Sequence, residues 1–283
     1  MYTKILLPLD TSELARKILL PLGSLLGAEP IEWVTLLGVV DLDAAQETKD
    51  AEYAELQTVQ EELVRQGVRA KLRIVNGKPA QGILDAVDEL KPDLVAMSTH
   101  GRSGISRWIR GSVAERVLRH CPVPLLMCNQ ASFEGASPQG NFKSIVVPLD
   151  GSELAADVIP HVKEIAKLYG STLHLIRVQP FLYSTVADLG PMPTAWEPDN
   201  ITEVLQPTAE ALRKEGFEVK VHAGLGDEAL EIIKLAERQH ADLIAITTHG
   251  RSGVSRWAFG SVAERVVRHS PCPLLVLRHH EKK

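Results

Sequence analysis

Two short segments combine glycine, serine and arginine at the same spacing, and these residue types bind phosphate. Each has a small residue, a histidine and a glycine, and then, after nine intervening residues, a Gly-Ser pair: Ser98, His100, Gly101, Gly111 and Ser112, and again Thr247, His249, Gly250, Gly260 and Ser261. Glycine lets backbone N–H groups approach a phosphate, and a helix that starts after the last glycine points its positive end at the anion. Arginines lie nearby in both segments: Arg102, Arg107, Arg251 and Arg256. The spacing indicates a phosphate-binding loop that occurs twice.

The same serines also fit a structural role that needs no ligand. Ser112 and Ser261 each begin the sequence Ser-Val-Ala-Glu, which matches a capping box at the start of a helix. In that alternative the serines cap helices and the glycines only serve a tight turn. The spacing alone leaves both interpretations open.

The two segments belong to a repeat that runs through most of the chain. Lys4–Asp10 matches Lys143–Asp150, and Ser-Glu-Leu-Ala follows each aspartate. About nine extra residues of the second copy fall within 180–200, where proline and turn-forming residues indicate a loop. Serine, glycine and proline between the copies are typical of a linker. We therefore predict two domains, at residues 1–130 and 142–283, with a linker at 131–141.

Apolar periodicity predicts the same alternation of strands and helices in both copies. The expected strands are Ile5–Leu9, Trp33–Val40, Ala70–Val75, Leu94–Met97 and Pro124–Met127, and after the first strand of the second copy Thr172–Val178, Glu218–His222, Leu243–Ile246 and Pro273–Leu277. The expected helices are Leu14–Leu26, Ala51–Gln66, Ala80–Leu90, Leu154–Ala166, Thr202–Lys214 and Glu228–Gln239, and one helix after each glycine segment. Thr11 or Ser12 can cap the first helix, and Ser152 its counterpart.

This alternation predicts a parallel sheet with helices on both faces. Parallel sheets of this kind bind ligands at the carboxyl ends of their strands. Asp10 and Asp150 end the first strand of each copy, and the glycine segments follow the fourth. We therefore expect the aspartates and the glycine segments to meet at one edge of each sheet.

Composition and charge narrow the class of protein. Apolar residues make up 45% of the chain and charged residues 24%, which is ordinary for a globular protein, and the net charge of −5 disfavours a general nucleic-acid binder. The chain shows neither a signal peptide nor an apolar stretch of about 18 residues, so we expect no membrane partner. Cys121, Cys128 and Cys272 fit reduced core thiols, which favours a cytoplasmic protein.

Several motifs together resemble those of a known family. These are Leu7–Asp10 and Val147–Asp150, the two glycine segments, and the closing segments His120–Met127 and His269–Val276. The chain resembles a tandem universal stress protein with two UspA-like domains. The implied fold is α/β, with two Rossmann-like (adenine nucleotide alpha hydrolase-like) domains in tandem, each with a parallel five-stranded sheet.

The chain departs from the family pattern at one position of each copy. The family's nucleotide-binding members carry a glycine where this chain has Ser98 and Thr247. If that position needs a positive φ, these residues would strain the backbone. If it needs only a small side chain, serine fits better than threonine. The departure then lowers the expected nucleotide affinity more in the second copy than in the first.

The resemblance implies ATP as the ligand of one or both domains. The implied binding residues of the first domain are Pro8, Leu9, Asp10, Val39, Val40, Ser98, His100, Gly101, Arg102, Gly111, Ser112 and Val113. Those of the second are Pro148, Leu149, Asp150, Val178, Gln179, Thr247, His249, Gly250, Arg251, Gly260, Ser261 and Val262. Mg²⁺ would come with the phosphates, with Asp10 or Asp150 as an optional ligand.

The resemblance also implies a regulatory, stress-related role rather than catalysis. The sequence contains no Walker lysine and no evident base with a nucleophile, so we assign no catalytic residue and keep slow ATP hydrolysis as the weakest alternative. A nucleotide-free interaction protein with a structural loop is the other alternative. The family pairs its last strands in dimers, which implies an internal pseudo-dimer here and leaves a homodimer of whole chains open.

Overall fold

The computed structural model describes residues 2–10, 12–26, 31–99, 113–135, 141–180, 198–248 and 260–278. The strands of the first half are β1 (Lys4–Pro8), β2 (Trp33–Val40), β3 (Ala70–Asn76), β4 (Leu94–Ser98) and β5 (Leu125–Cys128). Its helices are α1 (Glu13–Arg16), α2 (Leu19–Leu26), α3 (Gln46–Arg65), α4 (Pro79–Leu90), α5 (Val113–His120) and α6 (Gln130–Gly135).

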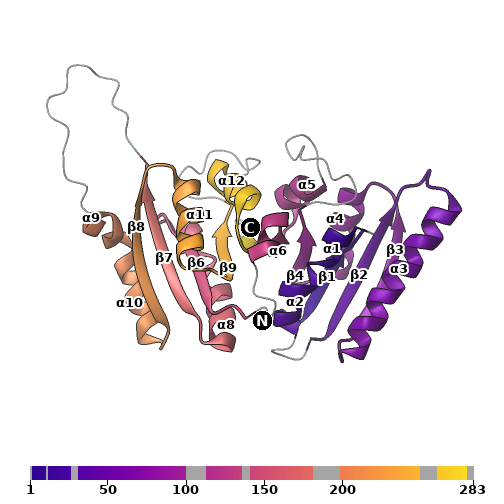
Figure 1. Ribbon diagram of the computed structural model, residues 1–283, viewed down its shortest axis with the longest axis horizontal. Helices are drawn as coiled ribbons and strands as arrows, with labels where there is room; N and C mark the ends of the chain where they lie inside the picture. Colours follow the sequence, from indigo (N-terminus) through magenta and orange to yellow (C-terminus); the bar gives the residue numbers. More distant parts are fainter. Residues whose placement is uncertain are drawn as a thin grey trace, which may run out of the picture.

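The second half repeats this order (Figure 1). Its strands are β6 (Ser144–Pro148), β7 (Thr172–Gln179), β8 (Glu218–Leu225), β9 (Leu243–Thr247) and β10 (Leu274–Leu277). Its helices are α7 (Glu153–Ala156), α8 (Ile159–Tyr169), α9 (Pro198–Thr202), the 3₁₀ helix η1 (Glu203–Leu205), α10 (Gln206–Lys214), α11 (Glu228–Arg238) and α12 (Ser261–His269).

All ten of these strands form one sheet in the order β3-β2-β1-β4-β5-β10-β9-β6-β7-β8. Strands within each half are parallel, whereas β5 and β10 pair antiparallel, with Leu126 opposite Leu275. The predicted α/β fold with two parallel five-stranded halves in tandem is confirmed. The last strands of the two halves pair with each other inside the chain, as the resemblance implied.

The sheet is buried on both faces because most of its strands are continuous apolar runs. One core cluster joins the sheet to α2 and α3 in the first half and to α8 and α10 in the second. The other joins it to α4, α5, α11 and α12. Each cluster includes residues from both halves, so the two halves share their hydrophobic packing across the β5–β10 pair.

Prolines explain why three expected helices are interrupted. Pro160 lies in the first turn of α8, and Pro21 lies in the first turn of α2, one position further into the helix. A proline ring clashes with the carbonyl four residues earlier, so a helix cannot continue through these points from α7 or α1. Pro207 likewise lies at the start of α10, after η1. The expected helix at Thr202–Lys214 is therefore divided, and Ser12 and Ser152 cap α1 and α7 as predicted.

The start of the expected linker is a structured junction between the halves. Helix α6 covers Gln130–Gly135, and just before it the buried Asn129 reaches the C-terminus of α12. Its Nδ2 donates to the carbonyl oxygens of Val267, Arg268 and Ser270 at 3.3, 3.4 and 3.0 Å. The amide thereby satisfies helix-terminal carbonyls of the opposite half, which composition alone does not reveal.

A second polar contact of this junction comes from Ser132. Its Oγ donates to the carbonyl oxygen of Cys272 at 2.9 Å, and its N–H donates to Asn129 Oδ1 at 2.8 Å. Near the other end of the strands, Tyr2 Oη and His161 Nδ1 lie 2.9 Å apart, which also joins the halves. Among the helices that the structure describes, none is both long enough and apolar enough to cross a membrane.

Candidate functional site

The expected binding residues that the structure describes lie at the carboxyl ends of adjacent strands and at the starts of α5 and α12. We call Pro8–Asp10, Val39–Val40, Ser98 and Val113 the first rim. The second rim consists of Pro148–Asp150, Val178–Gln179, Thr247 and Gly260–Val262. β1 pairs with β2 on one side and β4 on the other, and β6 does the same with β7 and β9. Strand order reverses beside these central strands, and such a reversal is where open α/β sheets hold ligands.

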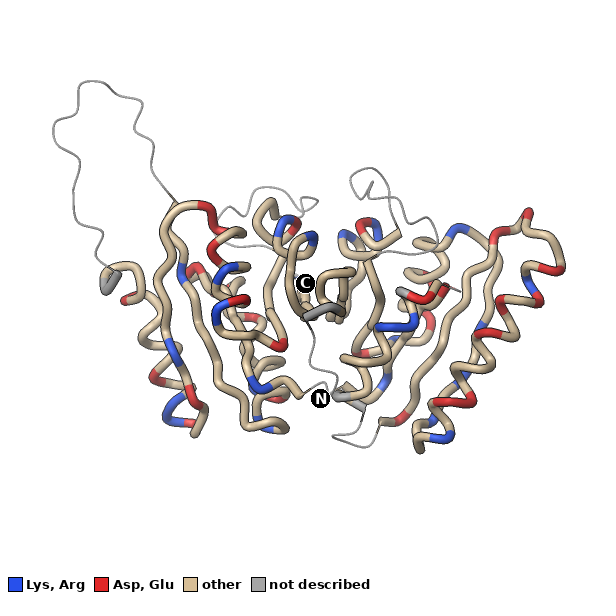
Figure 2. Tube along the Cα trace, viewed as in Figure 1, with Lys and Arg blue, Asp and Glu red and all other residues tan. Residues whose placement is uncertain are grey.

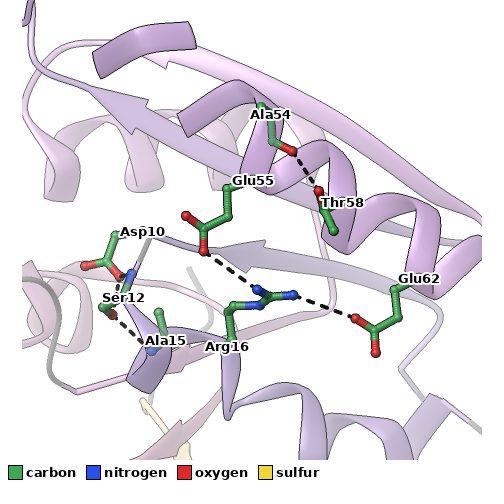
Figure 3. A network of polar contacts seen from close by, with 8 residues as sticks. All are labelled: Asp10, Ser12, Ala15, Arg16, Ala54, Glu55, Thr58 and Glu62. Atoms are coloured by element: carbon green, nitrogen blue, oxygen red, sulfur yellow. Dashed lines mark hydrogen bonds and ion pairs between the residues drawn. The ribbon is translucent and has the colours of Figure 1, made fainter. Parts of the chain in front are cut away.

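Asp10 is fixed by a local turn at the end of β1. Its Oδ1 accepts hydrogen bonds from the backbone N–H and Oγ of Ser12, at 3.0 and 2.5 Å. The Ser12 Oγ in turn accepts from the N–H of Ala15 at 3.1 Å, which caps α1 (Figure 3). Aspartate and serine therefore hold each other, and the carboxylate has a defined place at the first rim.

The second half builds the same turn at Asp150. Ser152 donates through its N–H and Oγ to Asp150 Oδ1 at 2.9 and 2.5 Å, and accepts from Ala155 N–H at 3.1 Å. The same aspartate–serine turn therefore fixes a carboxylate at each rim, where it can orient a ligand.

The first half connects its turn to the rest of the fold through Arg16. The guanidinium of Arg16 lies 3.8 Å from the carboxylate of Glu55 and 3.9 Å from that of Glu62, both on α3 (Figure 3). Exposed pairs at this distance contribute little to stability, about 0–1 kcal/mol each. They connect α1, which follows the Asp10 turn, to α3.

Ser98 and Thr247 occupy the positions where the family pattern has glycine. Both are the last residues of strands, β4 and β9. Among the described non-glycine residues only Lys91 and His240 have positive φ, so neither Ser98 nor Thr247 is strained in this way. The position therefore needs no positive φ in either copy, and the alternative that it needs only a small side chain is the one that remains.

Gly260 has a different and purely spatial requirement. Its N–H donates to the carbonyl oxygen of Thr248 at 3.1 Å, and an added Cβ would lie 2.7 Å from that oxygen. Its φ of −62° is ordinary, so the close approach to Thr248, and not conformational freedom, requires glycine. This contact draws the start of α12 against the end of β9.

Ser261 is not the cap that the Ser-x-x-Glu pattern indicated. Gly260 is the N-cap of α12, and Ser261 is the exposed first residue inside the helix. Glu264 bonds to Arg268 at 3.0 Å, in an i,i+4 pair. The capping-box alternative is wrong for the second copy, and the Ser261 hydroxyl stands at the positive end of a helix.

Part of the expected site lies outside the described residues. These are His100, Gly101, Arg102, Gly111 and Ser112 of the first copy, and His249, Gly250 and Arg251 of the second. Within the described part of the chain, no three His, Cys, Asp or Glu side chains gather in a way that could hold a metal ion. Any Mg²⁺ at Asp10 or Asp150 would therefore depend on ligand oxygens as well.

Sequence reasoning missed Arg177, which lies in β7 at the second rim. Its Nη1 donates to the backbone carbonyl of Asp150. Aligning the strands of the two copies residue by residue would have exposed it, because the position is a glycine in the first copy. Burial raises the pKa of nearby Glu228, the charge of Arg177 opposes that rise, and the charge of Asp150 adds to it. Three charged groups thus influence one another at this rim.

A histidine pair lies away from both rims, on β7 and β8. His174 Nδ1 and His222 Nε2 are 3.0 Å apart, so one nitrogen donates and the other accepts when both rings are neutral. Burial lowers the pKa of both histidines, that of His174 to about 4. Lys220 adds to both shifts, the His222 ring adds to that of His174, and Arg238 adds to that of His222. The pair is therefore neutral at pH 7.

Comparisons with known proteins cover both halves. The model of the Universal stress protein family matches residues 1–129 and 141–278. Universal stress protein MJ0531 of Methanocaldococcus jannaschii is 35% identical over 153 residues, which cover 50% of this chain and 85% of that protein. Universal stress protein E of Escherichia coli K12 is 26% identical over 225 residues, 75% of this chain and 69% of that protein. A solved universal stress protein from Archaeoglobus fulgidus superimposes with a TM-score of 0.77 at 25% identity, covering 98% of this chain and 99% of that one.

Proposed function

We propose that this chain, which belongs to the universal stress protein family, is a cytoplasmic regulatory protein that binds ATP or a related adenine nucleotide. The observation that carries the proposal is the convergence at one sheet edge of a fixed aspartate and the start of a helix. In the second half these are Asp150, held by Ser152, and α12, drawn in by Gly260. A nucleotide needs both, because its sugar and base take directed hydrogen bonds and its phosphates need N–H groups and positive charge.

The proposed roles follow this division. Asp10 and Asp150 would bond to ribose or adenine, and the ends of β2 and β7 (Val39–Val40 and Val178–Gln179) would face the base. The phosphates would meet the glycine segments, which include Val113 and Ser261 at the first turns of α5 and α12. Mg²⁺, when bound, would neutralise part of the phosphate charge, with Asp10 or Asp150 completing its oxygen ligands.

A second candidate is a nucleotide-free interaction protein. Gly260 favours it, because the close contact with Thr248 requires a glycine whether or not a ligand binds. In that case the repeated segment would be a structural loop, and the protein would act through its surface alone.

Release of bound ligand from the purified protein separates the two candidates. The protein is denatured, the supernatant is analysed by mass spectrometry, and binding of ATP with Mg²⁺ is then measured by equilibrium dialysis. The proposal predicts adenine nucleotide in the supernatant or saturable ATP binding, with weaker binding of cAMP, which lacks the triphosphate. Neither released nucleotide nor saturable binding would leave the interaction protein as the better candidate.

A further inference from the structure

The two rims can be compared residue by residue, because strand pairing aligns the halves. Pro8 on β1 pairs with Leu37 on β2, and Pro148 on β6 pairs with Ile176 on β7. The next residue toward the rim is Gly38 in the first half and Arg177 in the second. After β3 and β8 the same alignment matches Gly77 with Gly226. Each of these glycines lies in the turn before the next helix, α4 or α11.

The first difference is the side chain beside the aspartate. In the second half Arg177 reaches the rim and donates to the carbonyl of Asp150. In the first half a Cβ on Gly38 would lie 2.6 Å from Leu56 Cδ1, because α3 packs against the strand there. A side chain at this position would require Leu56 to move, and the first half has glycine there, so it has no charge beside the aspartate.

The second difference lies at the starts of α4 and α11. Asp227 caps α11, accepting from Leu230 N–H at 2.9 Å, and pairs with Arg265 of α12 at 2.5 Å. The hydrogen bond from Arg265 holds the pKa of Asp227 below its usual range. The equivalent residues of the first half are Lys78 and Arg116. Two cations thus occupy the places where the second half has a neutral ion pair.

The third difference is in the residues that follow these caps. Glu228 and Glu231 stand in the first turn of α11, whereas the first turn of α4 has no acidic residue. Figure 2 shows acidic residues where β8 runs into α11. Pro79 occupies the position of Glu228 in the first half, so the half-buried carboxyl of Glu228 has no counterpart there.

These differences make the first rim less negative than the second. At the compared positions and at the residue that follows β2, the first half has two cations and two anions, namely Lys78, Arg116, Asp10 and Asp41. The second has two cations and three anions at the equivalent places: Arg177, Arg265, Asp150, Asp227 and Glu228. A triphosphate is strongly anionic, so its electrostatic energy differs between the rims in favour of the first.

We propose that the rims are unequal: the first is the nucleotide site, and the second binds the same nucleotide at least about tenfold more weakly. This inference rests on the proposed function and assigns its ligand to one half. Lys78 with Arg116 favours the anion in the first rim. Arg177, held on the Asp150 carbonyl, and the acidic start of α11 disfavour it in the second.

The test measures both the number of sites and their place. Equilibrium dialysis with ATP and Mg²⁺ counts equivalents per chain, and the photoreactive analogue 8-azido-ATP, followed by peptide mapping, locates the site. We expect one equivalent, with label in residues 1–129. Two equivalents of equal affinity, or label chiefly in residues 141–278, would overturn the inference and leave the proposed function standing. Absence of binding at both halves would overturn both.

Charge exchange between the halves tests the cause. Lys78→Asp installs the residue that already caps α11, so the fold is retained, and we expect ATP to bind about tenfold more weakly. Lys167→Asp is the matched control: it makes the same charge change near the end of α8, at the opposite edge of the sheet, and ATP affinity should not change. The double variant Asp227→Lys with Glu228→Pro should add a second equivalent. Equal effects of the Lys78 and Lys167 variants would refute the electrostatic assignment, even if the double variant fails to fold.

Discussion

Replacing Asn129 with alanine removes the side chain that joins the first half to the C-terminus of α12. The amide donates to three carbonyl oxygens at 3.0–3.4 Å and accepts from Ser132, and the residue is only 3% exposed. A buried hydrogen bond contributes about 1 kcal/mol, and buried groups that lose their partner cost more, so we expect a loss of about 2–4 kcal/mol. The predicted result is a large fall in the free energy of unfolding caused by one uncharged side chain.

Urea denaturation followed by circular dichroism measures this loss. Asn141→Ala is the matched control, because that asparagine is exposed at the far end of the junction and should change stability by less than about 0.5 kcal/mol. Asn129→Asp sharpens the test, since it keeps the shape but turns a donor into a negative charge that faces carbonyl oxygens. A greater loss is expected for aspartate than for alanine. Equal stability of the Asn129→Ala and Asn141→Ala variants would refute the proposed role of the junction.

Two further predictions concern single positions. The folded pKa of His174, about 4, lies below the ordinary value near 6.5, so protons favour the unfolded chain: stability is complete above pH 6.5 and falls as pH drops toward 4. His174→Thr, which copies Thr35 of the first half, should remove about 2 kcal/mol of the loss between pH 7.5 and pH 5, as measured by urea denaturation at both values; an unchanged pH dependence would contradict this. Gly260→Ala should lower the melting temperature in calorimetry, because its Cβ would lie 2.7 Å from the carbonyl oxygen of Thr248. An unchanged melting temperature would contradict the claim that this contact requires glycine.

The strands were predictable because their signal is local. The apolar run that predicts Trp33–Val40 matches the observed strand at both ends. A strand buried on both faces needs apolar side chains throughout, and that need is visible in the sequence. The pairing of β5 with β10 followed from the family resemblance, since no local signal specifies which edge strands meet.

The misjudged features depend on one residue or on distant contacts. The start of α12 after Gly260 was predicted correctly, but the capping-box alternative placed the cap on Ser261, whereas the structure caps the helix with Gly260. Gly260 takes this place because it packs against the carbonyl of Thr248, and a contact between residues this far apart in the chain cannot be inferred from the sequence. Asn129 reads as the edge of a linker until its partners on α12 are known. Arg177 could be recognised only by aligning β2 and β7 of the two copies residue by residue.

Nucleotide content of the purified chain tests the central claim most directly. The protein is denatured without added ligand, and adenine nucleotide per chain is then quantified by mass spectrometry, with a second sample equilibrated first with ATP and Mg²⁺. The account predicts about one equivalent of adenine nucleotide in the equilibrated sample. A chain that retains no adenine nucleotide under either condition would contradict the claim that these rims are nucleotide sites.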